Sequence, residues 1–254
     1  SGIKSSRCDS VASESSHKSA QEAALLFDHP RVHRSLPEKV GRRAERIVSL
    51  VPSLSESLVA LELSHRLVGV TEYCVYPEHA FDAFPKLGGT KDVDVAALRA
   101  LAPTHVVLNI DENRRELSEE LATFVEHIIV THPLAPGDNL VLFDLFGKLF
   151  RRTEAAHQLA QKFRAAIAEL AAIENKPRQR VLYLIWRDPW MTITAETYIA
   201  RMLELIDWQS VPASAPARYP AIELEAFAGR VDRVLLSSEP YAFRDKHIAE
   251  VSAH

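Results

Sequence analysis

Short apolar runs alternate with amphipathic segments along the first half of the chain. The apolar runs cover residues 46–51, 66–70, 104–110 and 126–133, and each has the length of a strand. The segments between them place apolar side chains at helical spacing, over residues 53–63, 94–103 and 112–125. Strands that alternate with helices pair in parallel, and helices then cover both faces of the sheet. We therefore predict an amino-terminal α/β lobe over residues 23–138, with its functional loops at the carboxyl ends of the strands.

The pattern changes after residue 138. Residues 139–175 contain hardly a break and are rich in Ala, Leu, Lys, Arg and Glu, with Gly147 as the one glycine. This composition favours one long helix, or two abutting ones. Alternation then resumes, with predicted strands at 180–186, near Val211 and at 232–238, and predicted helices at 196–206, at 221–228 and from Phe243 onward. We predict an α/β fold of two Rossmann-like lobes with mostly parallel sheets. One long backbone helix joins the lobes, a ligand cleft lies between them, and residues 176–254 form the carboxy-terminal lobe.

The amino-terminal end has a different character. The segment "SGIKSSRCDSVASESSHKSA" is rich in serine and lacks the hydrophobic core of an export signal. Low hydrophobicity and the absence of a period predict a disordered leader over residues 1–22. Residues 25–37 are read as a short irregular strand or hairpin. A protein whose export signal has been removed and a protein that was never exported both fit this end.

Composition excludes several classes of protein. The chain has 254 residues, of which 47% are hydrophobic and 25% are charged, as in a globular protein with a sizeable core. A net charge of −4 argues against nucleic-acid binding. No apolar run approaches the length of a membrane span, so we expect no membrane insertion. Two cysteines, Cys8 and Cys74, do not make a disulfide framework, and sequence alone does not pair them.

Aromatic side chains gather on loops that follow predicted strands. Trp186 and Trp190 flank a turn at the end of one strand, and Tyr219 precedes a predicted helix. In the first lobe, Tyr73 and Tyr76 follow the second strand. One interpretation is an aromatic wall for a flat ligand, and the other is that the rings cap the core of each lobe. Their recurrence on several loops favours the wall.

The polar loops give weaker signals. Gly88-Gly89 is interpreted as a permissive turn, since "GGTKD" lacks the spacing of a phosphate-binding loop. Residues 111–114 are read as capping the following helix in preference to contacting a ligand. His79 and His132 lie in loops after strands and are candidates for ligating a metal or a haem, but no metal-ligand spacing accompanies them. No nucleophile motif is present, so we predict neither a metal site nor an enzyme.

Three stretches in this order carry a family resemblance: "RIVSLVPSLSESLVAL", "VGVTEYCVYPEHA" and "GGTKDVDVAALRALAPTHVVLN". They resemble the amino lobe of ABC-transporter substrate-binding proteins that bind cobalamin, haem and iron–siderophores. The uninterrupted segment that follows is similar to the backbone helix of that class, and "VLYLIWRDPWMTITAETYIARMLELI" is similar to the start of its second lobe. The chain ends before the last strand and helix that this resemblance leads us to expect.

The resemblance implies a site. Tyr73 or Tyr76 matches a tyrosine of the family's "YxxYP" loop, Tyr219 matches an aromatic residue before a proline, and Met191 falls near an apolar contact. Where cobalamin binders place tryptophans, this chain has other residues, namely Thr90 or Lys91, and Asn109. The implied ligand-binding residues are Tyr73, Tyr76, Thr90, Lys91, Asn109, Trp186, Trp190, Met191 and Tyr219. A glutamate that docks the family's amino lobe on its transporter corresponds to Ala96, which leaves Asp94 and Glu225 as candidates.

The resemblance also implies a function. We expect a monomeric, non-catalytic periplasmic protein that requires no cofactor and captures cobalamin or a related corrinoid for an ABC-transporter permease. Haem is an alternative ligand, with His79 or Tyr76 as its axial residue. A ferric siderophore is another, for which Arg187, Lys91 and Arg218 would bind the anionic chelate. A cytoplasmic corrinoid-handling module on the same scaffold is the alternative from a different class.

Overall fold

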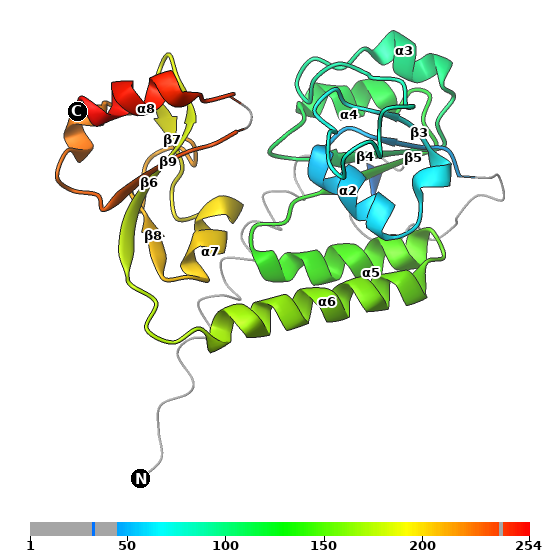
Figure 1. The fold of residues 1–254 in the computed structure, drawn as a ribbon. Helices are drawn as coiled ribbons and strands as arrows, with labels where there is room; N and C mark the ends of the chain where they lie inside the picture. The colour runs from blue at the N-terminus through cyan, green and yellow to red at the C-terminus, as the bar shows by residue number, and fades with distance from the viewer. Residues whose placement is uncertain (1–31, 34–44, 239–240) are drawn as a thin grey trace. The chain divides into compact units, whose positions relative to one another are not determined.

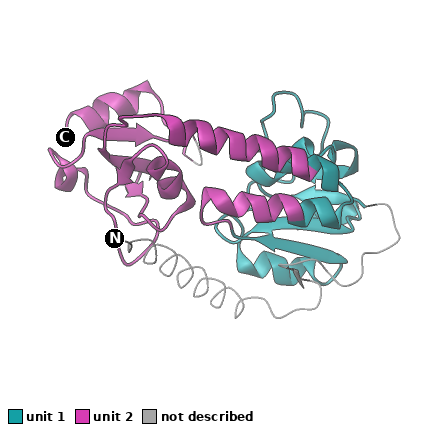
Figure 2. Cartoon of the chain, turned by 90° about the horizontal axis from the view of Figure 1, so that it is seen from below, with its two compact units in different colours: residues 1–132, 145–155 teal, residues 133–144, 156–254 magenta. Residues whose placement is uncertain are grey.

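The computed structural model describes residues 32–33, 45–238 and 241–254. The predicted leader at residues 1–22 lies outside the described residues, as does most of the segment 25–37. The chain divides into two compact units (Figure 2). Unit 1 comprises Ser1–His132 and Leu145–Ala155, and unit 2 comprises Pro133–Asp144 and Ala156–His254. Each unit is described by itself below.

Unit 1 is built on a sheet whose pairings are all parallel (Figure 1). Its five strands run in the order β1-β5-β4-β2-β3. They are β1 (Val32–His33), β2 (Ile47–Ser49), β3 (Leu67–Val70), β4 (His105–Asn109) and β5 (His127–Thr131). Parallel strands bring all of their carboxyl ends to one edge of the sheet, so the loops that follow β2, β3, β4 and β5 meet there. The prediction of a parallel α/β sheet is confirmed for this unit.

Helices cover the sheet of unit 1 because its strands are apolar on both faces. The helices are α2 (Pro52–Ala60), α3 (Val95–Ala100) and α4 (Arg115–Leu121), with a 3₁₀ turn η1 (Ser64–Arg66) before β3. One face of the sheet carries Val48, Val106 and Ile128, and it packs with Leu98 of α3 and Leu121 of α4. The alternate positions are buried as well, which is what near-continuous apolar strands predict.

Residues 139–175 form two helices, which corrects the prediction of one long backbone helix. A 3₁₀ turn η2 (Pro136–Asp138) leads into α5 (Asn139–Leu149), and α6 (Thr153–Ala172) follows. The two helices run antiparallel (Figures 1 and 2), and the rings of Phe143 and Phe163 lie 6.2 Å apart. The break does not fall at Gly147. It falls at Arg151, which adopts a left-handed φ of 57°.

The turn after α5 is closed by a pair of backbone hydrogen bonds. The amide of Arg152 donates to the carbonyl of Gly147 over 2.7 Å, and the amide of Arg151 donates to that of Lys148 over 3.4 Å. Helices commonly end in this way, with a glycine at the left-handed position. Here an arginine occupies that position, and its guanidinium pairs with the buried carboxylate of Glu45, which also accepts from Arg66 over 3.2 Å. Because an arginine and not a glycine holds the left-handed position, the break leaves no glycine signal in the sequence.

Unit 2 is built around one central strand, β6 (Gln179–Trp186). β8 (Trp208–Ser210) and β9 (Arg233–Leu236) pair with it in parallel, and β7 (Met191–Thr192) pairs with it antiparallel. The remaining elements are α7 (Tyr198–Glu204), the 3₁₀ turn η3 (Leu224–Phe227) and α8 (Asp245–Ser252). The predicted helix at 221–228 is therefore only a short 3₁₀ turn. The sheet is mostly parallel, as predicted, but β7 was not predicted.

Candidate functional site

The loop after β3 exposes two tyrosines at the carboxyl edge of the unit 1 sheet. Tyr73 is 44% exposed and Tyr76 is 65% exposed, and Val75 between them is exposed as well. The intervening Cys74 is buried and anchors the loop, because its sulfur lies 3.1 Å from Ser55 Oγ and 3.2 Å from Thr71 Oγ1. A short loop that is fixed from below and presents apolar side chains outward is typical of a binding surface.

The Gly88-Gly89 turn lies beside this loop. The segment before it pairs with β3, since Val70 and Lys86 form a parallel bridge, and the amide of Glu72 donates to the carbonyl of Gly88. Gly88 adopts a φ of +82°, so the interpretation as a permissive turn is confirmed. Gly89 lies next to the ring of Tyr73, and a Cβ there would be 3.2 Å from Tyr73 Cε2. The turn thus forms the support on which the Tyr73 ring lies.

The structure brings Thr90, Lys91 and Asn109 into one hydrogen-bonded group. Lys91 Nζ donates to the carbonyl of Asp111, and the Asn109 side chain accepts from the amide of Asp111. Asn113 joins both segments, because its side-chain amide donates to the carbonyl of Thr90 and accepts from the amide of Asn109. Residues 111–114 were predicted to cap the following helix. The N-cap residue of α4 is Arg114, however, and its side chain makes no capping hydrogen bond. The role of Asn113 was missed for this reason.

The two candidate axial histidines are held by carboxylates. His79 is 79% exposed at its side chain, and its Nδ1 lies 2.9 Å from Asp82 Oδ2. His132 lies 3.5 Å from Asp111 Oδ1 and is mostly buried. Among the residues that the structure describes, no group of three or more His, Cys, Asp or Glu side chains is arranged to hold a metal ion. In the same residues no helix is long and apolar enough to cross a membrane.

In unit 2, Trp186 ends the central strand and remains 40% exposed. It pairs across the sheet with Met191 of β7, and its ring meets the edge of Tyr241 at a centroid distance of 5.5 Å. Trp190 differs. Its ring is stacked on Phe243 at 6.1 Å with an interplanar angle of 1°, and it packs against the core cluster of unit 2. Trp186 is thus exposed, whereas Trp190 is partly buried against the core of unit 2.

Tyr219 lies on a segment that runs beside β7. The amide of Thr194 donates to the carbonyl of Arg218, the amide of Thr192 donates to that of Pro220, and Ala221 bridges to Met191. Tyr219 is half-buried, with the Arg218 guanidinium 5.5 Å from its ring. These backbone contacts place Tyr219 and Met191 on neighbouring segments of unit 2.

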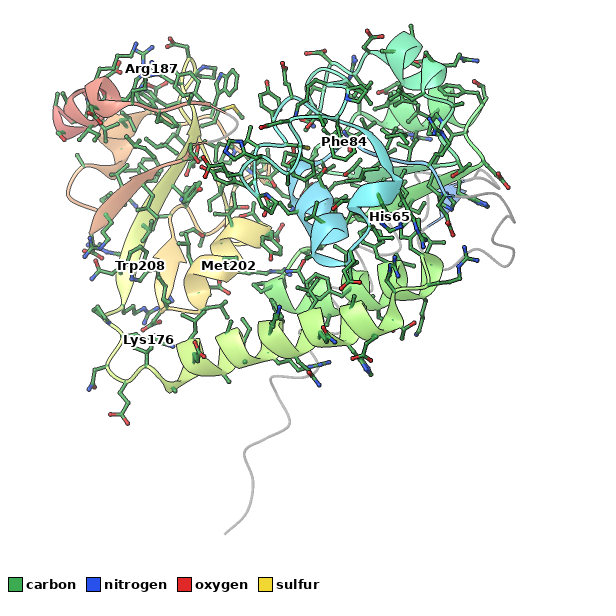
Figure 3. All side chains as sticks on the ribbon, turned by 45° about the vertical axis from the view of Figure 1, so that its right-hand side comes forward. His65, Phe84, Lys176, Arg187, Met202 and Trp208 are labelled. Atoms are coloured by element: carbon green, nitrogen blue, oxygen red, sulfur yellow. The ribbon has the colours of Figure 1, made fainter. Side chains whose placement is uncertain are left out.

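Arg187 lies in the turn between Trp186 and Trp190, called the tryptophan turn below, and it binds Glu250 of α8 (Figure 3 labels Arg187). Its guanidinium binds both carboxylate oxygens of Glu250 and lies 5.5 Å from the ring of Trp190. The hydrogen bond from Arg187 lowers the pKa of the Glu250 carboxyl below its usual value, and the same bond raises the pKa of Arg187. The turn between Trp186 and Trp190 therefore depends on the last helix of the chain.

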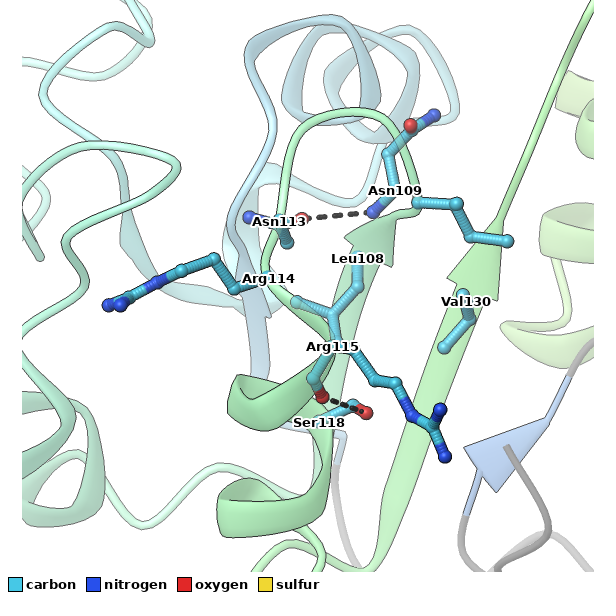
Figure 4. Close-up of a pocket in the computed structure, with 8 residues that line it drawn as sticks. Leu108, Asn109, Asn113, Arg114, Arg115, Ser118 and Val130 are labelled. Atoms are coloured by element: carbon cyan, nitrogen blue, oxygen red, sulfur yellow. Dashed lines mark hydrogen bonds between the residues drawn. The ribbon is translucent and has the colours of Figure 1, made fainter. Parts of the chain in front are cut away.

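A small, open pocket lies beside the first turn of α4 (Figure 4). Its apolar floor is formed by Leu108, Ile110 and Val130, and Arg115 and Ser118 of α4 line its side. Figure 4 shows the Arg114 side chain directed away from Leu108 and Val130. Of the predicted ligand-binding residues, Asn109 alone lines this pocket, so the pocket is not the predicted aromatic site.

Comparison with known proteins gives a family. The sequence profile of a family described as periplasmic binding protein matches residues 47–250. Among curated proteins, the chain is 24% identical over 218 residues to a vitamin B12-binding protein of Yersinia pestis, which covers 84% of this chain and 78% of that protein.

Solved structures share the fold. The periplasmic vitamin B12 binding protein of Vibrio cholerae has a TM-score of 0.66 and 19% identity, over 82% of this chain and 79% of that one. A periplasmic haem binding protein from Pseudomonas aeruginosa has a TM-score of 0.72 and 19% identity, over 83% of this chain and 77% of that one. At such identities these likenesses establish the fold and leave the ligand open.

Proposed function

The chain belongs to the periplasmic binding protein family, a family of non-catalytic binding proteins, and we propose that it captures cobalamin or a related corrinoid. The observation that carries this proposal is the exposure of aromatic side chains at the carboxyl edges of two sheets. Tyr73 and Tyr76 provide that surface in unit 1, and Trp186 provides it in unit 2. Flat aromatic faces suit a large planar ligand with apolar edges.

The names of similar proteins support a tetrapyrrole-like ligand. A curated relative and a solved structure with the same fold are both vitamin B12-binding proteins. All nine predicted site residues stay a prediction. Among them, we propose that Tyr73 and Tyr76 contact the ligand from unit 1, and that Trp186, Met191 and Tyr219 contact it from unit 2. The predicted position of the ligand between the two lobes also stays a prediction, which variants in each unit can test separately.

We further propose that the protein is periplasmic and delivers its ligand to an ABC-transporter permease, as its family implies. Two acidic residues were candidates for contacting such a permease. Asp94 accepts from the amide of Ala97 at the start of α3, so its carboxylate is already used as a helix cap. Glu225 is exposed and its carboxylate lies 3.0 Å from His254, so we take it as the docking candidate that caps no helix.

Haem is the second candidate ligand because one loop exposes two side chains that can ligate iron. Tyr76 and His79 are three positions apart, and both are largely exposed. The hydrogen bond from His79 to Asp82 is the kind of carboxylate contact that orients a ligating imidazole. Several haem-binding proteins share the fold.

A ferric siderophore fits the site less well. The three cations proposed for an anionic chelate already have partners: Arg187 binds Glu250, Lys91 donates to the carbonyl of Asp111, and Arg218 donates to that of Glu196. Glu72, Asp92 and Glu112 add exposed carboxylates to the loops at the same edge of unit 1. Negative charge at the rim opposes an anionic ligand.

The experiment is a titration of the purified protein with cyanocobalamin, followed by absorption and tryptophan fluorescence, and then the same titration with haem. Saturation at one equivalent of cyanocobalamin, with quenching that is lost in Trp186→Phe, supports a corrinoid site at Trp186. A shift of the haem absorption bands on binding, which disappears in Tyr76→Phe or His79→Ala, supports the haem alternative. Saturable binding of neither ligand would contradict both.

A further inference from the structure

Asn113 is buried between three segments of unit 1 and bonds to each of them. Its Nδ2 donates to the carbonyl of Leu50 over 3.1 Å and to the carbonyl of Thr90 over 2.9 Å, and its Oδ1 accepts from the amide of Asn109 over 2.9 Å. Leu50 follows β2, Thr90 follows the glycine turn, and Asn109 ends β4. One side chain therefore links three neighbouring segments at the carboxyl edge of the sheet (Figure 4 shows the bond to Asn109).

The asparagine side chain meets a specific requirement at this position. Two carbonyls need donors and one amide needs an acceptor, and a carboxamide supplies both from a short side chain. An aspartate would place a charged oxygen against two carbonyl oxygens, and an alanine would leave three buried polar groups without this partner. This set of partners also fixes which end of the side chain is nitrogen.

The bond to Thr90 leads directly to the exposed aromatic surface. Thr90 follows Gly89, and Gly89 lies against the Tyr73 ring at a distance that leaves no room for a methyl group to be added without movement. The carbonyl of Gly88 accepts from the amide of Glu72, which holds the other side of the turn against the Tyr73 loop. A shift of Thr90 would therefore move the surface that supports Tyr73.

We propose that Asn113 is a positioning residue for ligand binding, which acts through the glycine turn on Tyr73 and does not touch the ligand. This inference rests on the proposed function, because it concerns the same aromatic site. In this proposal, the buried Asn113 side chain sets the distance between the turn at residues 88–91 and the end of β4. Affinity then depends on a hydrogen-bonded link below the surface as well as on the tyrosines themselves.

The test is a double-mutant cycle between Asn113→Ala and Tyr73→Ala, with cyanocobalamin as the probe. We expect Asn113→Ala to weaken binding about tenfold in the wild-type background, and by less than about twofold when Tyr73 is already alanine. Equal losses in both backgrounds would overturn the proposal, because Asn113 would then not act through Tyr73. If Asn113→Ala does not fold, Asn113→Ser goes through the same cycle, since its hydroxyl is neutral and keeps one donor and an acceptor.

Ser118→Ala is the matched control. Ser118 is also buried and lines the same pocket as Asn113, but its hydroxyl donates to the carbonyl of Arg115 over 2.7 Å and so links no loops (Figure 4). We expect this variant to lose stability without losing affinity. An equal loss of affinity in Ser118→Ala would mean that any buried defect near α4 disturbs the site.

A second measurement does not depend on the ligand. The near-ultraviolet circular dichroism of tyrosine should change in Asn113→Ala relative to Ser118→Ala, because the environment of Tyr73 changes. If wild-type protein binds no cyanocobalamin, the proposed function fails, and this spectrum still decides whether Asn113 positions Tyr73. An unchanged tyrosine spectrum would contradict the positioning role.

Discussion

The ring of Tyr73 lies so close to Gly89 that a Cβ at position 89 would be 3.2 Å from its Cε2 atom. This contact joins an exposed aromatic residue to a turn whose backbone is fixed by its neighbours. It makes position 89 a direct probe of the aromatic surface.

Replacement of Gly89 by alanine should move the Tyr73 ring and weaken cyanocobalamin binding by about 1 kcal/mol, with a smaller change in melting temperature. Isothermal titration of the two proteins measures the effect. Gly137→Ala is the control, because a Cβ at Gly137 would meet no atom within 4 Å. Unchanged affinity in Gly89→Ala would place the ligand away from Tyr73.

Replacement of Gly88 by alanine should destabilise the fold by about 1–3 kcal/mol, because a left-handed residue would gain a side chain. The added Cβ would also lie 2.4 Å from the backbone oxygen of Asp92, so the turn would have to open. Chemical denaturation of the full-length variant and of the wild-type protein measures the loss of stability. A stability equal to that of the wild-type protein would show that the turn relaxes freely.

The two tryptophans of the β6–β7 turn should separate in their effects. Trp190→Ala removes a ring that is stacked on Phe243, and we expect a loss of about 2–4 kcal/mol in stability. Trp186→Ala removes an exposed ring, and we expect weaker ligand binding with little change in melting temperature. Thermal unfolding and titration of both variants give the comparison. The reverse outcome would place Trp190 at the ligand and Trp186 in the core.

The buried Glu45 carboxylate should contribute more to the free energy of unfolding than an exposed ion pair does. Glu45→Gln leaves Arg66 largely buried beside a neutral side chain and should cost about 3 kcal/mol in unfolding free energy. Glu119→Gln breaks the exposed pair with Arg115 and should cost less than about 1 kcal/mol. Urea denaturation of both variants tests the difference. Equal costs would mean that Glu45 and its arginines stay solvated.

Acid should weaken the contact between Arg180 and Asp232. The carboxylate of Asp232 accepts from the Arg180 side chain and backbone, and these bonds lower the pKa of Asp232 to about 2, from an ordinary value of 3.8. A lowered pKa means that the stabilisation is present above the ordinary value and is lost as the pH falls toward the folded value. Wild-type protein should therefore lose stability relative to Asp232→Asn between about pH 4 and pH 2. Parallel acid titrations of the two proteins would contradict this if their curves stayed a constant distance apart.

The sequence predicted the elements that have strong periodicity. The parallel strands of unit 1 and the central strand β6 were predicted within a few residues, because continuous apolar runs mark strands that are buried on both faces. The sequence left open whether residues 139–175 form one helix or two, and it did not place the break, because the left-handed position is held by Arg151 and not by a glycine. Its partner Glu45 lies 106 positions away, and no local pattern contains that ion pair.

The candidate site divides in the same way. Loops after strands could be located from the strand pattern, so Tyr73, Tyr76 and Trp186 were predicted as exposed aromatics and are exposed. The roles of Asn113 and Trp190 depend on contacts between distant segments, such as the bond from Asn113 to Leu50, 63 positions away, and the Phe243 stack. Whether a side chain faces a ligand or a core is decided by such contacts, which periodicity does not report.

The ion pair between Arg187 and Glu250 joins residues 63 positions apart and so has a practical consequence for anyone who expresses the protein. A shortened coding sequence that ended before α8 would keep every strand of unit 2, yet the tryptophan turn would lose its anchor. Trp186 would then report the loss through its fluorescence even though no residue near it had been altered. Clones that stop before Glu250 are therefore unsuitable for measuring how tightly this protein holds a ligand.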